Sequence, residues 1–421
     1  MNSLLLIRKK GVDIALVRLG KLLPIFLFII LQGCITVSGY FFKMGVKEMK
    51  SDNYKPAIRY FDAAILFNDK ISYYYYNRAF SKHKLERYDD AISDYSKAID
   101  LTKNNDSAYN NRGNCKYDKG NYKEALKDFK KASEIDPWEP MYFSNRGLSK
   151  EKLGRLKAAY LDYTKAINLE SDYHTSYKNR GDVYYKWRKY KRAISDFDKA
   201  IALKSDYHSA YNKRGLAKMK LTQFPNALKD FKKAIRINPD KAAPYRNIAF
   251  IKYQREKYSE SLTFINHAIE RREHPAYFYR RALAKKGLND FKGAITDCNR
   301  ALEKGYDGSD IHLTFAICEY HLGHHEKAVH NLDRAIKADS SNASAYYYRG
   351  RARIKLDRFD QALADFQKAI ELDPEYGAAH YGAALALIRQ GILYGKCNYL
   401  LKAESLGYQK ASELIETHCK R

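Results

Sequence analysis

From residue 38 onward the chain alternates two kinds of amphipathic segment, in which small and aromatic residues recur at helical spacing. The first kind carries one Gly or Ala. The second kind starts at a Tyr or Phe, followed by an alanine, by an aromatic residue four positions later and by another alanine three positions after that. The clearest copy has Gly113, Tyr122, Ala125, Phe129 and Ala132 at these places. Because such spacing puts the small and aromatic residues on one face of a helix, the pattern predicts pairs of helices packed through these faces.

The pattern repeats with a fixed period. The first alanine of the second segment recurs every 34 residues, with one step of 33, at Ala57, Ala91, Ala125, Ala159, Ala193, Ala227, Ser261, Ala294, Ala328 and Ala362. The small residues of the first segment are Gly45, Ala79, Gly113, Gly147, Gly181, Gly215, Ala249, Ala282, Ala316, Gly350 and Ala384. We expect each of these small residues to nest against the alanine that begins the second helix, with the aromatic residues filling the remaining space.

One copy carries a full family signature, made of Tyr109, Gly113, Tyr122, Ala125, Phe129, Ala132 and Pro137. This pattern resembles the tetratricopeptide repeat family, and the resemblance extends over about residues 38–390. It implies an all-α fold, a right-handed α-solenoid of about ten to eleven helical hairpins with a C-terminal capping helix. The repeats are expected to begin near residues 38, 72, 106, 140, 174, 208, 242, 275, 309, 343 and 377. Residues 391–421 break the period and are expected to form the cap, with a hairpin remnant over 393–405 and a final amphipathic helix over 409–419.

The N-terminal segment, residues 1–34, has the features of a secretory signal. Five Lys and Arg residues precede an apolar run from Leu22 to Leu31, which is shorter than the roughly 20 residues that span a bilayer. The run ends in Leu31-Gln32-Gly33-Cys34, which resembles a bacterial lipoprotein signal and implies lipidation of Cys34. An uncleaved signal anchor from about Leu22 to Phe42 is the alternative. Both interpretations place the repeats on the periplasmic side of a bacterial envelope, because the positive flank stays in the cytoplasm.

The composition is strongly basic, with a formal net charge of +27. Such a charge attracts acidic proteins, acidic glycans and nucleic acid alike. An envelope location disfavours nucleic acid as the partner.

Part of this charge is expected to be neutralised inside the fold. In seven repeats an arginine precedes the small residue of the first helix and an aspartate follows the second-helix alanine by three positions. The predicted pairs are Arg78–Asp94, Arg112–Asp128, Arg146–Asp162, Arg180–Asp196, Arg214–Asp230, Arg281–Asp297 and Arg349–Asp365. The full repeats that have Met44, Ile248 or Phe315 in place of the arginine also lack the aspartate. This joint change predicts a ladder of partly buried ion pairs between the two helices of each hairpin, although copies that diverged early could have lost both residues without any contact.

In proteins that this chain resembles, the first helices line a concave face that binds extended peptides or partner helices. The corresponding binding candidates here are aromatic and basic or polar: Tyr73, Tyr76, Phe80, Asn110, Asn114, Tyr117, Lys178, Tyr185, Lys186, Asn212, Arg246, Phe250, Tyr253, Tyr279, Tyr347 and Tyr381. Tyrosine gives a large contact area at low entropic cost, and cations attract acidic ligands. The alternative for each tyrosine is packing between adjacent repeats.

Motifs for catalysis and metal binding are absent from the sequence. Five histidines gather at His312, His321, His324, His325 and His330, but the spacing of His325-Glu326 to His330 is one residue too long for a zincin motif. No cysteine pair has zinc spacing. Cys298 occupies a second-helix aromatic position and is expected to be a buried thiol, while a Cys397–Cys419 disulfide in the cap is left open. We therefore expect no catalytic residue, no metal and no cofactor.

These observations predict a protein–protein interaction scaffold rather than an enzyme. Its expected partners are proteins or peptides, with acidic ones favoured by the charge, and no small-molecule substrate is expected. The alternative is a basic solenoid that binds a polyanion, either nucleic acid or acidic glycan. The partner, the pathway, the membrane leaflet and the oligomeric state do not follow from the sequence.

Overall fold

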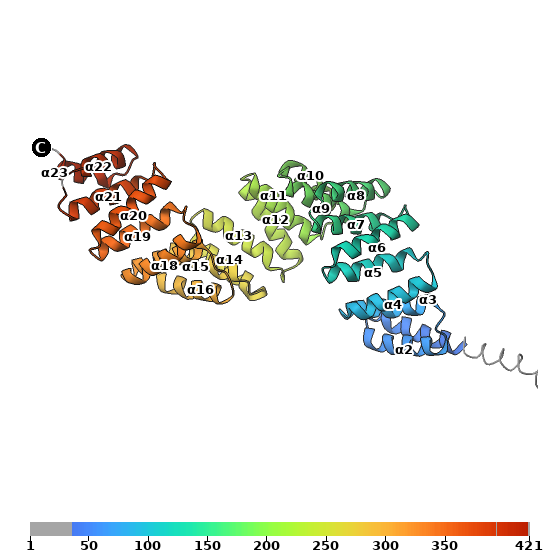
Figure 1. Cartoon of the computed structure of the whole chain (residues 1–421). Helices are drawn as coiled ribbons and strands as arrows, with labels where there is room; N and C mark the ends of the chain where they lie inside the picture. Colours follow the sequence, from blue (N-terminus) through green and yellow to red (C-terminus); the bar gives the residue numbers. More distant parts are fainter. Residues whose placement is uncertain (1–35, 393, 420–421) are drawn as a thin grey trace, which may run out of the picture. The chain divides into compact units, whose positions relative to one another are not determined.

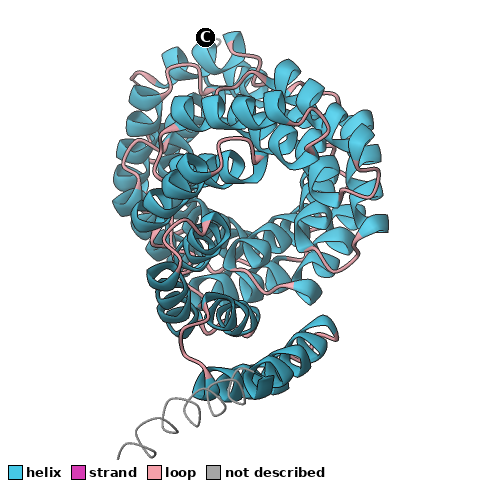
Figure 2. Cartoon of the chain, turned by 90° about the vertical axis from the view of Figure 1, so that its right-hand side faces the viewer, coloured by secondary structure: helices cyan, strands magenta, loops and turns pink. Residues whose placement is uncertain are grey.

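The computed structural model describes residues 36–392 and 394–419. The predicted signal segment, including Cys34, lies outside these residues. The described part consists of helices joined by short loops and contains no strand (Figure 2). None of its helices combines the length and the apolar character needed to cross a bilayer. The predicted all-α solenoid of helical hairpins is confirmed.

The chain divides into two compact units at Ala217 and Lys218. In the first unit, residues 36–50 are helical and precede a run of helices that pack side by side in sequence order (Figure 1). These are α2 (Tyr54–Phe67), α3 (Ser72–Lys84), α4 (Tyr88–Leu101), α5 (Asp106–Asp118), α6 (Tyr122–Ile135), α7 (Pro140–Lys152), α8 (Leu156–Leu169), α9 (His174–Lys186), α10 (Tyr190–Leu203) and most of α11 (His208–Lys220).

The second unit continues the same alternation of 13- and 14-residue helices in most of its hairpins. Its helices are α12 (Phe224–Ile237), α13 (Ala242–Gln254), α14 (Tyr258–Arg271), α15 (Pro275–Gly287), α16 (Phe291–Glu303), α17 (Ser309–His321), α18 (His325–Ala338), α19 (Ala343–Lys355), α20 (Phe359–Leu372), α21 (Gly377–Arg389), α22 (Lys396–Ser405) and α23 (Lys410–His418).

A left-handed residue ends the first helix of each hairpin. Gly120 and Gly154 take this conformation at φ +87° and +75°, where glycine carries no steric cost. The same register is occupied by Asp52, Glu86, Arg188, Thr222, Glu256, Asn289 and Asp357 at φ between 56° and 60°. Thr222 is β-branched and is the most strained of these residues. The turn is therefore set by the packing of the two helices rather than by glycine alone.

The small residue of each first helix packs against the second helix, but its closest neighbour differs from the one expected. A Cβ built on Gly113 would lie 2.7 Å from Cε1 of Phe129, and one built on Gly147 would lie 2.6 Å from Cε1 of Tyr163. The aromatic ring, not the alanine that begins the second helix, is thus the nearest group. The ring lies over the glycine and fills the space between the helices. Where the small residue is an alanine, Ala79 and Ala282 share buried clusters with Ala91 and Ala294, the expected second-helix alanines.

Residue volume is balanced across this contact. Among the described glycines, those that face the ring of the second helix in their own hairpin form the pairs Gly45–Phe61, Gly113–Phe129, Gly147–Tyr163, Gly181–Phe197 and Gly350–Phe366. Where the first helix has Ala249, Ala282, Ala316 or Ala384, the corresponding second-helix residue is Ile265, Cys298, Leu332 or Leu400. In these four repeats an added methyl group on one helix is matched by a smaller side chain on the other, whereas Ala79 is paired with a full ring, Tyr95. Cys298 is the buried thiol that the sequence predicts.

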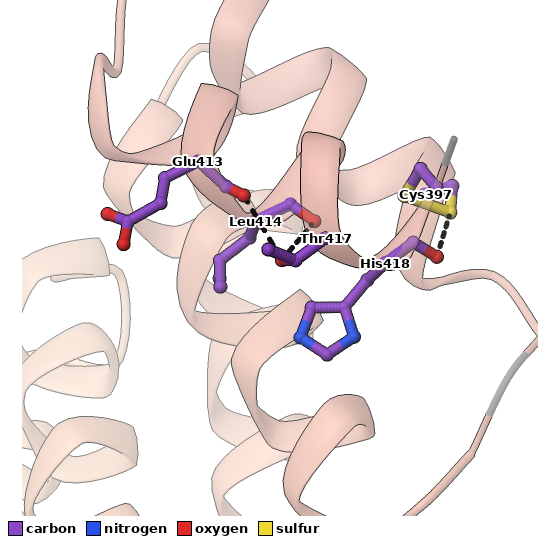
Figure 3. The surroundings of a disulfide bond; sticks show 6 residues. Cys397, Glu413, Leu414, Thr417 and His418 are labelled. Carbon is purple, nitrogen blue, oxygen red and sulfur yellow. Dashed lines mark hydrogen bonds between the residues drawn. A yellow bond between two sulfur atoms is a disulfide. The ribbon is translucent and has the colours of Figure 1, made fainter. Parts of the chain in front are cut away.

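The C-terminal helices α22 and α23 pack on α21. Ala384 of α21 shares a buried cluster with Leu400, Ala403, Ala411 and Ile415 of the two terminal helices. A disulfide joins Cys397 at the start of α22 to Cys419 after α23 (Figure 3). Hydrogen bonds from the Thr417 hydroxyl to the carbonyl oxygens of Glu413 and Leu414 lie in the last turn of α23 (Figure 3).

Candidate functional site

The predicted arginine ladder is present in the structure. Arg112 donates from Nε and Nη2 to the two carboxylate oxygens of Asp128 at 2.9 and 2.8 Å. The same two-pronged geometry joins the other pairs that lie within one unit: Arg78–Asp94, Arg146–Asp162, Arg180–Asp196, Arg281–Asp297 and Arg349–Asp365. All of these aspartates are buried. The ladder is therefore a structural element, and its arginines are not available to a ligand.

Each ladder arginine also reaches backward to the preceding hairpin. The Nη1 group of Arg112 donates to Ser96 at 2.9 Å, and those of Arg78 and Arg349 donate to Asp62 and Asp333 at 2.7 and 2.6 Å. The arginine thus ties together its own first helix, its own second helix and the second helix of the hairpin before it. The sequence analysis missed this third contact, whose acceptor stands 16 residues before the arginine in most rungs, but 13 before Arg146 and 15 before Arg281.

A further cation completes most rungs. Lys116, one turn after Arg112, donates to Asp128 at 2.6 Å, and Arg353 does the same for Asp365. The hydrogen bonds to Asp196 raise the pKa of Arg180 against the opposing effect of burial. Where the backward acceptor is a hydroxyl group, as for Arg112, two cations surround one buried carboxylate and the rung has a net positive charge. Where it is a second carboxylate, as for Arg78 and Arg349, the charges balance.

The repeats without the ladder arginine have a different surface. In the second unit, Phe264 lies beside a shallow groove of about 560 Å³ with Ile235 and Tyr245, and Phe315 and Asn331 line a second groove of about 610 Å³. The guanidinium group that crosses this space in the ladder repeats is missing at both places.

The predicted face of the first helices contains residues of every degree of exposure. Tyr73 and Lys186 are exposed, whereas Asn110 and Tyr347 are buried. The partly buried members are Tyr76, Phe80, Asn114, Tyr117, Lys178, Tyr185, Asn212, Arg246, Phe250, Tyr253, Tyr279 and Tyr381. The role of this face in binding stays a prediction.

Many of its tyrosines pack against a second ring. Tyr117, Tyr185 and Tyr253 each contact the tyrosine five residues later at centroid distances of 5.1, 5.4 and 5.6 Å. Tyr279 stacks on Tyr306 at 5.0 Å, and burial raises the pKa of Tyr279. These contacts favour the packing alternative for part of each ring, while the remaining ring surface is available to a ligand.

Internal partners also take up two of the predicted face cations of the first unit. Lys178 lies 2.8 Å from Asp182, and Lys186 lies 2.9 Å from Glu151. Burial would lower the pKa of Lys178, but Asp182 more than compensates, and the net shift is upward. Both lysines are therefore already paired with a carboxylate of the fold.

The second unit forms a more enclosed hollow on the first-helix face. A pocket of about 420 Å³ lies among α17, α19, α21 and the residues around the start of α23. Its lining includes two predicted residues, Tyr347 and Tyr381, and several that the sequence analysis missed: Tyr320, Arg351, Lys355, Arg389, Tyr408 and Lys410. Tyr320, Arg351 and Lys355 come from regular repeats, whereas Tyr408 and Lys410 belong to the cap. The repeat pattern could not indicate that the cap forms one side of the pocket, because the period ends before it.

The clustered histidines have structural contacts. His312 is buried and lies 2.6 Å from a carboxylate oxygen of Asp307, His324 lies 2.6 Å from Glu319, and His321 stacks on Phe291 at 4.7 Å. Within the described residues no three His, Cys, Asp or Glu side chains form a group that could hold a metal ion.

Sequence profiles agree with this architecture. Profiles described as tetratricopeptide repeat match residues 107–138, 174–207, 208–241, 279–343, 319–354 and 343–376, and one described as TPR repeat matches residues 81–116. Together they cover more than half of the chain, which therefore belongs to the tetratricopeptide repeat family.

Curated relatives match over a short stretch. The chain is 37% identical to bovine peptidyl-prolyl cis-trans isomerase FKBP4 over 81 residues, which is 19% of this chain and 17% of that protein. It is 37% identical to the mouse protein over 118 residues, or 26% and 25% of the two chains. Because the match spans a quarter or less of these relatives, the isomerase activity in their names is a statement about those proteins.

Solved structures extend the likeness to nearly the whole chain. The crystal structure of the APC/C hetero-tetramer Cut9–Hcn1 matches 90% of this chain and 89% of its own at 12% identity, with a TM-score of 0.50. A tetratricopeptide repeat protein from Parabacteroides merdae matches 59% of this chain and 98% of its own at 18% identity, with a TM-score of 0.44. At these identities the first match supports the fold alone. The fold is typical of protein-interaction scaffolds without enzymatic activity.

Proposed function

We propose that this protein is an envelope-tethered scaffold that holds peptide or protein segments on the face formed by its first helices. The observation that carries the proposal is the pocket of about 420 Å³ on that face, lined by tyrosines and cations. Aromatic rings with polar tips and long cationic side chains are the residue types that peptide-binding surfaces use. A partner segment in this pocket would contact several first helices at once.

The disulfide supports the location outside the cytoplasm. Cys397 and Cys419 are bonded, and structural disulfides persist in oxidising compartments such as the bacterial periplasm. The lipoprotein-type sequence that ends in Cys34 would supply the tether. The signal anchor is the competing form of attachment, although Phe42 already packs within the repeats, on Phe61 of α2 and Tyr74 of α3, at centroid distances of 5.8 and 5.1 Å.

The binding face is tested by site-specific photo-crosslinking in cells. A photoreactive residue replaces Tyr381 in the pocket. The control position is Lys368 on α20, which does not line the pocket and whose side chain is 40% exposed. We expect a discrete set of cross-linked proteins at Tyr381 that is missing at Lys368. Identical adducts at both positions, or none at Tyr381, would refute this binding face.

The tether is tested by the intact mass of the mature protein from a bacterial host, compared with a Cys34→Ala variant. A chain that begins at an acylated Cys34 supports lipid attachment. A soluble chain that still begins at Met1 contradicts it and favours the polyanion alternative. In that case binding would weaken steeply with salt, because a polyanion releases condensed counterions when it binds.

A further inference from the structure

The pocket on the second unit differs from the rest of the protein in its charge balance. Four cationic side chains line it: Arg351, Lys355, Arg389 and Lys410. Within the described part of the chain, no acidic residue lines it. Among the residues that the structure describes, none of the four has a carboxylate within ion-pair distance. The pocket therefore concentrates positive charge that the fold does not neutralise.

Helix α19 makes the contrast plain. Arg349 pairs with Asp333 and Asp365, and Arg353 pairs with Asp365, all at 2.6 Å. Arg351 lies between these two arginines in sequence but on another face of the helix, toward the pocket. Helix α19 thus carries two arginines that form ion pairs in the ladder, Arg349 and Arg353, and one, Arg351, that lines the pocket.

Aromatic rings hold Arg351 in place. Its Nη2 group donates to the Tyr320 hydroxyl at 3.2 Å, and its guanidinium carbon lies 4.7 Å from the Tyr320 ring centroid and 5.6 Å from that of Tyr347. A guanidinium group packed on rings keeps donors available for a carboxylate, in a fixed orientation. Binding of single-stranded nucleic acid relies on nucleobases that stack on open aromatic faces. Arg351 occupies the pocket-side faces of the Tyr320 and Tyr347 rings, so these faces are not open for such stacking.

The terminal helices supply one wall of the pocket. Tyr408 packs on Tyr381 at a centroid distance of 4.9 Å, and Lys410 begins α23. Cys419, just after α23, is bonded to Cys397 in the first turn of α22, so the disulfide closes a loop that contains both residues (Figure 3). A crosslink of this kind reduces the conformational freedom that the loop would gain if the cap opened, and so disfavours opening.

We propose that this pocket binds the side-chain carboxylates of an acidic protein segment, and that the Cys397–Cys419 disulfide holds the wall that completes it. The proposal rests on the proposed function and specifies the ligand class of that face. Arg351 and Arg389 bind carboxylates from α19 and α21, and Lys410 adds a third charge from the cap. The tyrosine hydroxyl groups donate further hydrogen bonds to the same ligand.

The ligand class is tested with the full-length protein and a short fluorescent peptide of alternating aspartate and leucine, capped at both ends so that only side-chain carboxylates are present. Binding is followed by fluorescence anisotropy. Arg351→Gln is expected to weaken binding about tenfold, the effect of one lost charge-assisted hydrogen-bonded contact. The matched control is Arg334→Gln, which removes the same charge from an exposed site on α18 and should leave the affinity unchanged. Arg389→Gln, at an exposed side chain, serves as the second variant if Arg351→Gln does not fold.

Three results would overturn the ligand class. The first is an equal loss of affinity in the Arg334 and Arg351 variants, which would mean attraction by net charge alone. The second is displacement of the peptide by oligothymidylate at an equal concentration, which would favour a polyanion. The third is no binding of the peptide at all. If Tyr381 still cross-links to proteins in that third case, the proposed function stands and only the acidic ligand class fails.

The role of the disulfide is tested with the double variant Cys397→Ser and Cys419→Ser. We expect it to remain helical by circular dichroism and to bind the same peptide about five- to tenfold more weakly, because the freed cap no longer holds Tyr408 and Lys410 against the pocket. Unchanged affinity would refute the supporting role of the disulfide. Loss of helical signal over the whole chain would refute it as well, since the bond would then support the fold in general rather than one wall.

Discussion

Replacing Asp128 by alanine should destabilise the protein by about 2–4 kcal/mol. The carboxylate accepts hydrogen bonds from Arg112 and Lys116, and its side chain is only 6% exposed. Breaking a buried pair costs about 3–5 kcal/mol because a charge remains without a partner. Here Arg112 and Lys116 are 18% and 19% exposed and can turn partly toward water, which lowers the expected cost.

The assay is urea unfolding of the variants, followed by circular dichroism, with hydrogen exchange of α5 and α6 to locate the loss. Asp100→Ala is the matched control, because Asp100 is exposed near the end of α4 and should change stability by less than about 0.5 kcal/mol. The double variant Arg112→Ile with Asp128→Phe reproduces the Ile248 and Phe264 pair of a repeat without the ladder and should cost less than Asp128→Ala alone. Equal losses for Asp100→Ala and Asp128→Ala, or a double variant worse than the single one, would refute the ladder as a stabilising element.

Three further predictions follow from the packing. Gly113→Ala should destabilise the protein by about 1–3 kcal/mol, since the new Cβ would lie 2.7 Å from the Phe129 ring. Adding Phe129→Leu should recover part of this loss, because the pair would then match Ala316 and Leu332. Additive losses of the two substitutions in thermal unfolding would contradict this compensation. Thr222→Gly should raise stability by about 0.5–1 kcal/mol because it relieves a β-branched residue at φ 59°, and a lower melting temperature would count against this strain. Burial raises the pKa of the Cys115 and Cys318 thiols to about 12 and 11. At pH 8 both thiols should therefore react with iodoacetamide only after denaturation, as measured by mass spectrometry. Labelling of the native protein would show that the helices around these thiols open readily.

The repetitive part of the fold could be predicted because the same small and aromatic residues pack the two helices together in most hairpins. The period of small and aromatic residues is sufficient to predict the helical pairs and their all-α stacking. The ladder was also predictable, since Arg and Asp disappear together at positions such as Ile248 and Phe264. When a chain contains many copies of one repeat, two residues that are lost together in the same copies are indicated to be in contact.

The contacts that the sequence did not predict depend on how hairpins stack, on the direction of side chains along a helix and on the cap, none of which follows from the repeat pattern. The backward contact of Arg112 to Ser96 joins two different hairpins, so it requires knowledge of how they stack. The nearest neighbour of Gly113 is a ring four residues beyond the expected alanine, because side-chain direction along a helix moves the contact by one turn. The pocket residues Tyr408 and Lys410 belong to the cap, where the period has ended.

The ladder also has a consequence for how the protein unfolds under heat or force. In the first unit, Arg78, Arg112, Arg146, Arg180 and Arg214 each donate to the hairpin before their own, so consecutive hairpins are linked without a break. In the second unit the links fail at Ile248 and Phe315. Since stability in a linear array is set by nearest-neighbour coupling, the first unit should melt as one cooperative block. The second unit should unfold in steps, and its partly unfolded states should start at the hairpins of Ile248 and Phe315, where the link is missing.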